Sequence, residues 1–228
     1  MITVYLVRHG QTEENLQRIF QGHMQGVLTK EGREQAAGLR VQLADLELDA
    51  VVSSDLQRVI DTVNLAFGNE KCELAGNDGR LSDSYNEKSM DESAVGLVNE
   101  DVNIHMLGKG DKSLVSCTSL SHHGRQIPWE TTQLLREIDW GSWTGMFISS
   151  VDTSHLPADA ETKEMLYARA GRFMKYLKMN YVGKSVLVVA HGLVNRSIQA
   201  QIEGVGVDHL YDVPHMKNAE MRMFRVQE

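Results

Sequence analysis

Two apolar, β-prone segments that each end in His-Gly constrain the fold of this chain more than any other feature. They are residues 4–10, Val-Tyr-Leu-Val-Arg-His-Gly, and residues 185–192, Ser-Val-Leu-Val-Val-Ala-His-Gly. Continuous apolar runs of this length are typical of strands that are buried on both faces. In open α/β sheets, ligands bind beyond the carboxyl ends of the strands, where N–H groups of the next helix can take an anion. We therefore expect His9 and His191 to face one pocket.

The rest of the chain alternates helix patterns with strand patterns. A helix is predicted from Thr29, which can cap it, because apolar residues recur at spacings of three and four up to Leu46. A strand over residues 49–53 and a helix to about residue 67 follow. Beyond the middle of the chain we expect a helix over 158–179, the second His-Gly strand, a helix through 202 and a strand over 221–226. This order predicts an α/β three-layer sandwich with a mostly parallel central sheet flanked by helices.

The regular pattern fails from Gly68 to about Trp129, where glycines, serines and charges are scattered among short apolar pieces. A structureless loop of that length is unusual in a compact domain, so we interpret residues 68–130 as an inserted cap or lid. With 228 residues, the chain fits a single domain, residues 1–228, that carries this insertion.

Charge and cysteine content narrow the function classes. The net charge of −8 argues against nucleic-acid binding. No apolar run is long enough to span a membrane and no basic leader precedes the first strand, so we expect a cytoplasmic protein. Cys72 and Cys117 match no metal-ligand spacing and are expected to be reduced thiols, with a disulfide between them as the alternative. His105, His122 and His123 are expected in a solvated loop of the insertion rather than at a metal.

Four motifs together carry a family resemblance. They are Arg-His-Gly-Gln-Thr-Glu-Glu-Asn at 8–15, Ser-Asp-Leu-Gln-Arg at 54–58, Glu137 shortly before a Trp-Gly pair, and His-Gly at 191–192. This pattern resembles the histidine phosphatase superfamily, the phosphoglycerate mutase-like enzymes, on both sides of the insertion. One position departs from the family pattern: Thr144 stands where the second Glu, after an aromatic residue and before Gly, is usual.

The resemblance implies a role for each matching residue. His9 takes the place of the nucleophile that becomes a phosphohistidine, and an imidazole with an ordinary pKa of about 6.5 is a competent nucleophile near pH 7. Arg8, Arg58 and His191 match the phosphate clamp, and guanidinium groups present forked donors that fit phosphate oxygens. Glu137 matches the general acid, with Asp139 as the next carboxylate to test. Asn15 and the backbone N–H of Gly192 are expected to make further contacts with the phosphate.

The resemblance implies neither a metal nor a cofactor. His23 follows the Gln-Gly of the family pattern and is expected either to border the pocket or to lie on the surface. We expect a phosphatase that hydrolyses a small phosphorylated metabolite, because only about twenty residues separate Gly141 from Glu161 and the chain ends two residues after Val226. Family mutases have a longer connection and a longer tail there. The alternatives are a phosphoglycerate mutase and an inactive member that binds a phosphorylated ligand; the oligomeric state is open.

Overall fold

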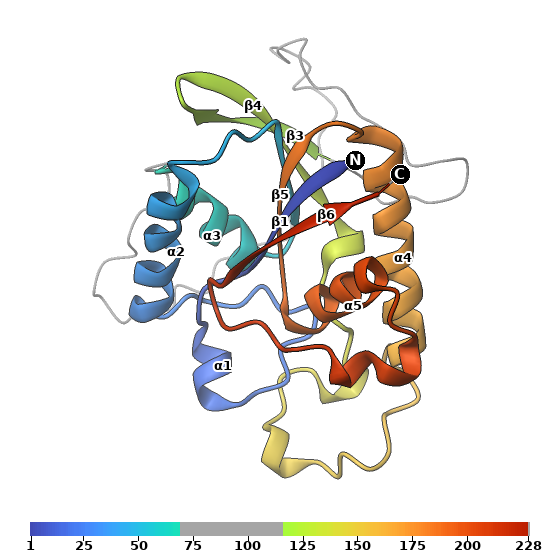
Figure 1. Cartoon of the computed structure of the whole chain (residues 1–228). Coiled ribbons are helices and arrows are strands. Elements are labelled where there is room, and N and C mark those ends of the chain that lie inside the picture. Colours follow the sequence, from blue (N-terminus) through green and yellow to red (C-terminus); the bar gives the residue numbers. More distant parts are fainter. Residues whose placement is uncertain (69–115, 228) are drawn as a thin grey trace, which may run out of the picture.

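The computed structural model describes residues 1–68 and 116–227, which form a central sheet with helices on both faces (Figure 1). The strands are β1 (Ile2–Arg8), β2 (Ala50–Ser54), β3 (Ser116–His122), β4 (Arg125–Thr132), β5 (Ser185–Ala190) and β6 (Met221–Val226). The α-helices are α1 (Glu13–Gln17), α2 (Lys30–Leu43), α3 (Gln57–Phe67), α4 (Lys163–Asn180) and α5 (Gly192–Glu203). Short 3₁₀ turns are η1 (Gln133–Leu135), η2 (Gly141–Trp143), η3 (Ile148–Ser150) and η4 (Val207–Asp212).

The six strands are ordered β3-β4-β2-β5-β1-β6. The four inner strands run parallel, and the edge strands β3 and β6 are antiparallel to their neighbours. The predicted α/β class with a mostly parallel sheet is confirmed. Because β1 and β5 are adjacent and Arg8 lies opposite Ala190, the two His-Gly segments leave the sheet side by side.

Each face of the sheet buries its own apolar cluster. Val4 and Leu6 of β1 belong to the cluster that includes Phe173 of α4, whereas Val7 belongs to the cluster that includes Val63 of α3. Side chains alternate across a strand, so one apolar run feeds both clusters. Figure 1 shows α4 and α5 on one side of the sheet and α2 and α3 on the other. Full burial of each such side chain stabilises the fold by about 1.5–3 kcal/mol. The stable sheet fixes the positions of the loops that follow its strands.

The predicted C-terminal boundary of the insertion, residue 130, was wrong, because residues 116–132 form two strands of the central sheet. β3 and β4 form a hairpin at the edge of the sheet, and β4 pairs in parallel with β2 from Val51↔Trp129 to Ser54↔Thr132. The strands are joined by His123 and Gly124 with φ of 50° and 73°, the positive pair of values that a type I′ turn requires. Residues 69–115, which hold the rest of the expected cap together with Cys72 and His105, lie outside the described residues.

The expectation of a solvated loop was wrong for His122 but is confirmed for His123, which is exposed in the turn of the hairpin. His122 ends β3 and is buried, and the Nε2 atoms of His122 and His123 lie 2.7 and 3.2 Å from the Leu46 carbonyl oxygen. A carbonyl only accepts, so each ring donates from Nε2. Within residues 1–68 and 116–227 no group of three His, Cys, Asp or Glu side chains is placed to hold a metal ion.

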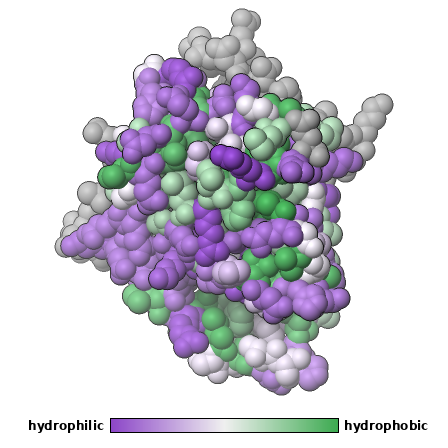
Figure 2. Space-filling view, in the orientation of Figure 1, coloured by the Kyte–Doolittle hydropathy of each residue, from purple (hydrophilic) through white to green (hydrophobic). Residues whose placement is uncertain are grey.

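Helix boundaries follow the capping residues more closely than the apolar stripes. Thr29 caps α2 by accepting the N–H of Gly32 at 2.9 Å, as predicted. α4 begins at Lys163 instead of residue 158, because Thr162 is its N-cap. None of the helices in the described residues has the length and apolarity needed to cross a membrane. On the face drawn in Figure 2, hydrophilic and hydrophobic residues are interspersed.

Candidate active site

The carboxyl ends of the four parallel strands meet at one edge of the sheet. In the register of the sheet, Arg8 lies opposite Ala190, Ser53 opposite Val189, and Ser54 opposite Thr132. His9 directly follows β1, and His191 directly follows β5. Their rings lie 5.1 Å apart between centroids in an edge-on arrangement. The two rings therefore lie next to each other at this edge of the sheet, and the expectation that both face one pocket stays a prediction.

His9 is held as a neutral imidazole in one tautomer. Its side chain is 2% exposed, and Nδ1 lies 2.7 Å from the carbonyl oxygen of Gly10. Because that oxygen only accepts, Nδ1 carries the proton and Nε2 keeps its lone pair. Burial lowers the pKa of His9 well below 6.5, and the positive charges of Arg58 and Arg8 lower it further. The ring therefore presents an unprotonated nitrogen at neutral pH.

The loop after His9 is packed tightly against the start of α2. A Cβ added at Gly10 would lie 2.3 Å from the carbonyl oxygen of Gly32, and one added at Gly32 would lie 1.9 Å from the carbonyl oxygen of Gln11. Only glycine permits this mutual approach. The N–H of Gly10 also donates to Oγ1 of Thr62, 3.1 Å away, and Thr62 donates to the carbonyl of Arg58 in α3. The backbone that carries His9 is thus fixed to both helices of this face.

Arg58 is fully buried beside the histidines. Its Nε donates to Nδ1 of His191 at 3.1 Å, Nη2 donates to the Gly22 carbonyl at 3.0 Å, and Nη1 donates to the Met24 carbonyl. Burial lowers the pKa of Arg58 to about 10, while the negative charge of Glu137 opposes the shift. Arg58 therefore stays cationic near neutral pH. A guanidinium group has five N–H bonds, so two remain for a ligand.

Arg8 provides a second, partly buried cation at the same edge. Nη1 lies 2.9 Å from His215 Nε2 and donates to the Met216 carbonyl, also at 2.9 Å. Burial lowers the pKa of Arg8, and the negative charge of Glu137 acts against this shift. The Nε of Arg8 is buried and has no hydrogen-bond partner among the residues described. A buried guanidinium N–H without a partner is costly unless an anion accepts from it.

His191 links Arg58 to β2. Because the guanidinium can only donate, Nδ1 of His191 accepts, and Nε2 then donates to Oγ of Ser54 at 2.8 Å. Burial lowers the pKa of His191 well below 6.5, followed by the charge of Arg58. Both ring nitrogens are engaged within the protein. The predicted contact between His191 and a phosphate stays a prediction, and it requires the exchange of one of these two bonds.

Glu137 places its carboxylate at the N-terminus of α5. Oε1 accepts the N–H groups of Ile138, Leu193 and Val194 at 3.1–3.2 Å, and Oε2 shares the N–H of Leu193. The helix N-terminus that we expected to take the phosphate therefore holds Glu137. A Cβ at Gly192 would lie 3.5 Å from Oε2 of Glu137 and 3.6 Å from Cζ of Arg8. The carboxylate of Glu137 and the guanidinium of Arg8 thus flank Gly192, which follows His191.

Asn15 lies in a capping box rather than in the cluster of rings and guanidinium groups. Its Oδ1 accepts the N–H of Thr12 and its own N–H donates to Oγ1 of Thr12, which caps α1. The side-chain nitrogen donates to Gln21, and Asn218 donates to Oδ1. Asn218 also donates to the His9 carbonyl at 3.1 Å. The predicted phosphate contacts of Asn15 and of the Gly192 N–H are not tested by this geometry.

Sequence reasoning missed the residues that hold the recognised ones in place. Ser54 is hydrogen-bonded to His191, and His215 is hydrogen-bonded to Arg8. Asn218 donates a hydrogen bond to the backbone carbonyl of His9. Their sequence context offers one usable signal, the polar Ser54 at the end of an apolar strand. The other two come from the loop before β6, which has no periodic pattern.

The acid-bearing segment borders a cavity of about 500 Å³ on its α4 side. His23 lines this cavity, and its Nε2 donates to the Glu137 carbonyl at 3.0 Å. Asp139 lines it as well, with its carboxylate 3.7 Å from Nδ1 of His23. His23 therefore borders the segment that carries Glu137. Thr144 is found beside Gly22, and its hydroxyl has no partner among the described residues.

Comparison with known proteins identifies the family of this chain. The histidine phosphatase superfamily (branch 1) matches residues 4–81 and 117–228. A broad-specificity phosphatase of Saccharomyces cerevisiae is 40% identical over 75 residues, which cover 32% of this chain and only 33% of that protein. A 2,3-bisphosphoglycerate-dependent phosphoglycerate mutase of Streptococcus pneumoniae is 27% identical over 223 residues, 93% of this chain and 89% of that protein. The alpha-ribazole phosphatase of Shigella flexneri shares the fold, with a TM-score of 0.68, 19% identity, and coverage of 99% of this chain and 91% of that chain. Because the family match includes both His-Gly segments and the acid-bearing segment between them, this chain belongs to branch 1 of the histidine phosphatase superfamily.

Proposed function

We propose that this protein is a phosphatase that hydrolyses small phosphomonoesters through a phosphohistidine on His9. The observation that carries the proposal is the state of His9: Nδ1 donates to Gly10, Nε2 keeps its lone pair, and burial together with the charges of Arg58 and Arg8 lowers the pKa of the ring, which keeps it neutral. Those same arginines supply the positive charge that a phosphoryl group needs. A nucleophile and its electrostatic clamp are thus present together, which is what phosphoryl transfer requires.

In the first half-reaction, Nε2 of His9 attacks phosphorus and the bond from phosphorus to the leaving oxygen breaks. The electron pair of that bond stays on the leaving oxygen, which takes a proton from Glu137 and departs as an alcohol. The imidazole becomes positively charged as the N–P bond forms. The hydrogen bond from Nδ1 to the Gly10 carbonyl then strengthens, because its donor carries charge. Arg8 and Arg58 hold the phosphate oxygens in line for the attack.

In the second half-reaction, water attacks the phosphorus of the phosphohistidine. Glu137 now accepts a proton from that water, the N–P bond breaks, and inorganic phosphate is released. The electron pair returns to Nε2, so His9 regains its neutral form. Glu137 thereby ends protonated, ready for the next turnover, and no proton is gained or lost by the enzyme over the cycle.

The phosphohistidine is tested by rapid quenching with substrate that carries a labelled phosphoryl group. We expect label on the protein that is stable in alkali and lost in acid, and no label in His9→Ala. The matched control is His123→Ala, an exposed histidine in the hairpin turn, which should keep the label. Label that persists in a folded His9→Ala variant would remove His9 from this role.

A phosphoglycerate mutase is the second candidate, because the mutase of Streptococcus pneumoniae matches nearly the whole chain. The two candidates differ in what takes the phosphoryl group from His9. We expect inorganic phosphate as the product from 3-phosphoglycerate or from a panel of sugar phosphates and other metabolites. Formation of 2-phosphoglycerate that needs 2,3-bisphosphoglycerate, without release of phosphate, would favour the mutase. The same panel tests the inactive alternative, which predicts binding without either product.

A further inference from the structure

Arg169 of α4 makes a dense set of hydrogen bonds directly behind the proposed acid. Its side chain is 11% exposed. Nη1 donates to the carbonyls of Leu134 and Arg136 at 2.9 and 2.7 Å, and Nη2 donates to the carbonyl of Glu137 at 3.1 Å. Nε and Nη2 donate to the two carboxylate oxygens of Glu161 at 2.9 and 2.7 Å. These five bonds match the five N–H groups of a guanidinium.

Glu161 extends this network to the far side of the acid. Its Oε2 accepts the N–H of Asp139 at 3.2 Å, and its own N–H donates to the Asp139 carbonyl at 2.7 Å. The Arg169–Glu161 pair thus holds the backbone on both sides of Glu137. The side chain of Glu137 is bonded to the start of α5, while its carbonyl is bonded to Arg169. The acid-bearing residue is therefore held between two helices.

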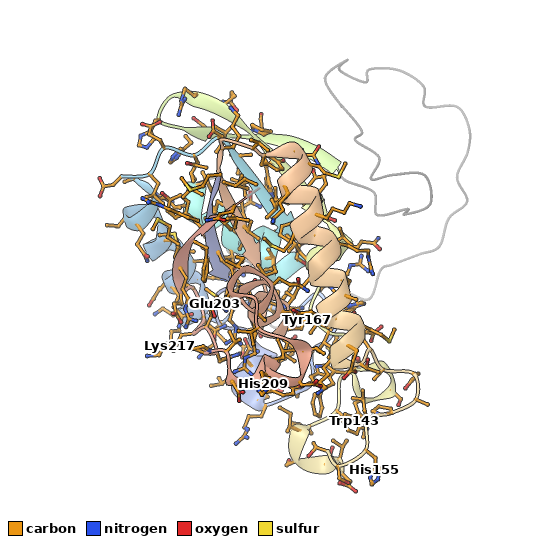
Figure 3. The ribbon with its side chains drawn as sticks, turned by 45° about the vertical axis from the view of Figure 1, so that its right-hand side comes forward. Trp143, His155, Tyr167, Glu203, His209 and Lys217 are labelled. Carbon is orange, nitrogen blue, oxygen red and sulfur yellow. The ribbon has the colours of Figure 1, made fainter. Side chains whose placement is uncertain are left out.

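The helix that carries Arg169 is itself anchored. Two residues earlier, Tyr167 donates its hydroxyl to the carbonyl of Val205, just beyond α5, at 2.9 Å. In Figure 3, Tyr167 lies between α4 and the end of α5, and the foot of α4 adjoins the segment that carries Trp143 and His155. Arg169 consequently reaches the Glu137 segment from a fixed base, which is what precise placement of a reacting group requires.

An ion pair that is largely removed from solvent, like Arg169–Glu161, is an inefficient way to gain stability, because desolvation of both charges offsets their attraction. It is an efficient way to orient backbone groups, because a planar guanidinium fixes several acceptors at once and a lysine cannot. We propose that Arg169, neutralised by Glu161, is a positioning residue that sets the geometry of proton transfer by Glu137. This inference rests on the proposed role of Glu137 as general acid.

The test compares leaving groups in the phosphorylation step, measured as the burst of alcohol or phenol release. Arg169→Lys should slow the burst about tenfold or more with an alkyl phosphate, because a displacement of about 1 Å is enough to disable a positioned group. With p-nitrophenyl phosphate, whose leaving group departs without a proton, the burst should change by less than about twofold. The matched control is Arg172→Lys, an exposed arginine on the same helix, which should leave both bursts unchanged.

A purely structural role would reduce both bursts equally, and that result in a folded Arg169→Lys variant would overturn the proposal. Glu161→Gln is the second variant, because it keeps the shape of the acceptor while it removes the neutralising charge. Glu161→Gln should show the same selective loss with the alkyl phosphate, and it tests the proposal even if Arg169→Lys does not fold. An unselective loss, or no loss, in Glu161→Gln would also overturn the inference.

The double variant Glu137→Gln/Arg169→Lys separates this inference from the proposed function. If Arg169 acts through Glu137, the double variant should lose no more than Glu137→Gln alone with the alkyl phosphate. Additive losses would show that Arg169 acts elsewhere. If Glu137→Gln itself shows no dependence on the leaving group, the proposed acid fails first, and any selective loss in Arg169→Lys then belongs to another acid.

Discussion

Replacement of Glu137 by glutamine gives the sharpest prediction about the chemistry. Glutamine can keep the acceptor oxygen at the position of Oε1, which takes the N–H groups of Ile138, Leu193 and Val194. Only the shared bond of Oε2 and the negative charge at the start of α5 are lost. These losses should lower the free energy of unfolding by about 1–2 kcal/mol. The variant should therefore fold, and its kinetics can be measured on native protein.

The expected loss of activity depends on the leaving group. An alkoxide is too basic to depart without a proton, so the burst with an alkyl phosphate should fall about 100-fold, which corresponds to about 2.7 kcal/mol in the barrier. The burst with p-nitrophenyl phosphate should fall far less, because nitrophenolate leaves unaided. Burst kinetics are needed because hydrolysis of the phosphohistidine also uses Glu137, as the base, and would hide the difference at steady state.

The comparison variant is Asp139→Asn, since Asp139 is the next carboxylate along the chain and accepts the N–H of Gly141 at 2.9 Å. We expect it to show no dependence on the leaving group. Equal losses of the Glu137→Gln burst with both substrates would refute the assignment of the acid. A selective loss in Asp139→Asn would then transfer the role to that residue.

Three further predictions concern stability and metal dependence. The pKa values of His9 and His191 in the folded protein lie below the unfolded value of about 6.5, so the unfolded chain takes up protons first as pH falls. The free energy of unfolding, measured in urea, should therefore be highest above pH ~6.5. Below that pH it should decrease by up to about 1.4 kcal/mol per pH unit for each histidine. A flat profile from pH 7 to 5 would contradict this. Gly10→Ala should lose at least about 2 kcal/mol because its Cβ meets the Gly32 carbonyl, whereas Gly38→Ala, in a helix and with open space around its Cβ, should gain about 0.5–1 kcal/mol; the same urea titrations decide both. Finally, a chelator should leave turnover unchanged, because guanidinium groups carry the phosphate charge; activity abolished by the chelator and restored by one divalent ion would contradict this prediction.

Local patterns were enough to predict the centre of the fold and most of the proposed chemical groups. A strand buried on both faces is typically apolar along most of its length, so residues 4–7 and 186–190 were identifiable without any partner. A polar residue directly after such a strand has to lie at the end of the sheet, which placed His9 and His191. Arg58 was identified by the family resemblance of its motif, which comes directly after β2.

The pairing of strands and the surroundings of each group were decided only by the tertiary structure. β3 and β4 carry polar residues and Pro128; β4 joins the sheet by pairing with β2, and β3 joins it by pairing with β4, and the local sequence encodes neither contact. Glu137 was found by its motif, but the three N–H groups that bind it come from its neighbour Ile138 and from a helix more than fifty residues away. Arg169 belongs to none of the sequence motifs, and its five acceptors converge only when α4 packs against the segment that carries Glu137. Hydrogen-bond partners depend on contacts between distant segments, and these form only when the two apolar clusters bring the helices onto the sheet.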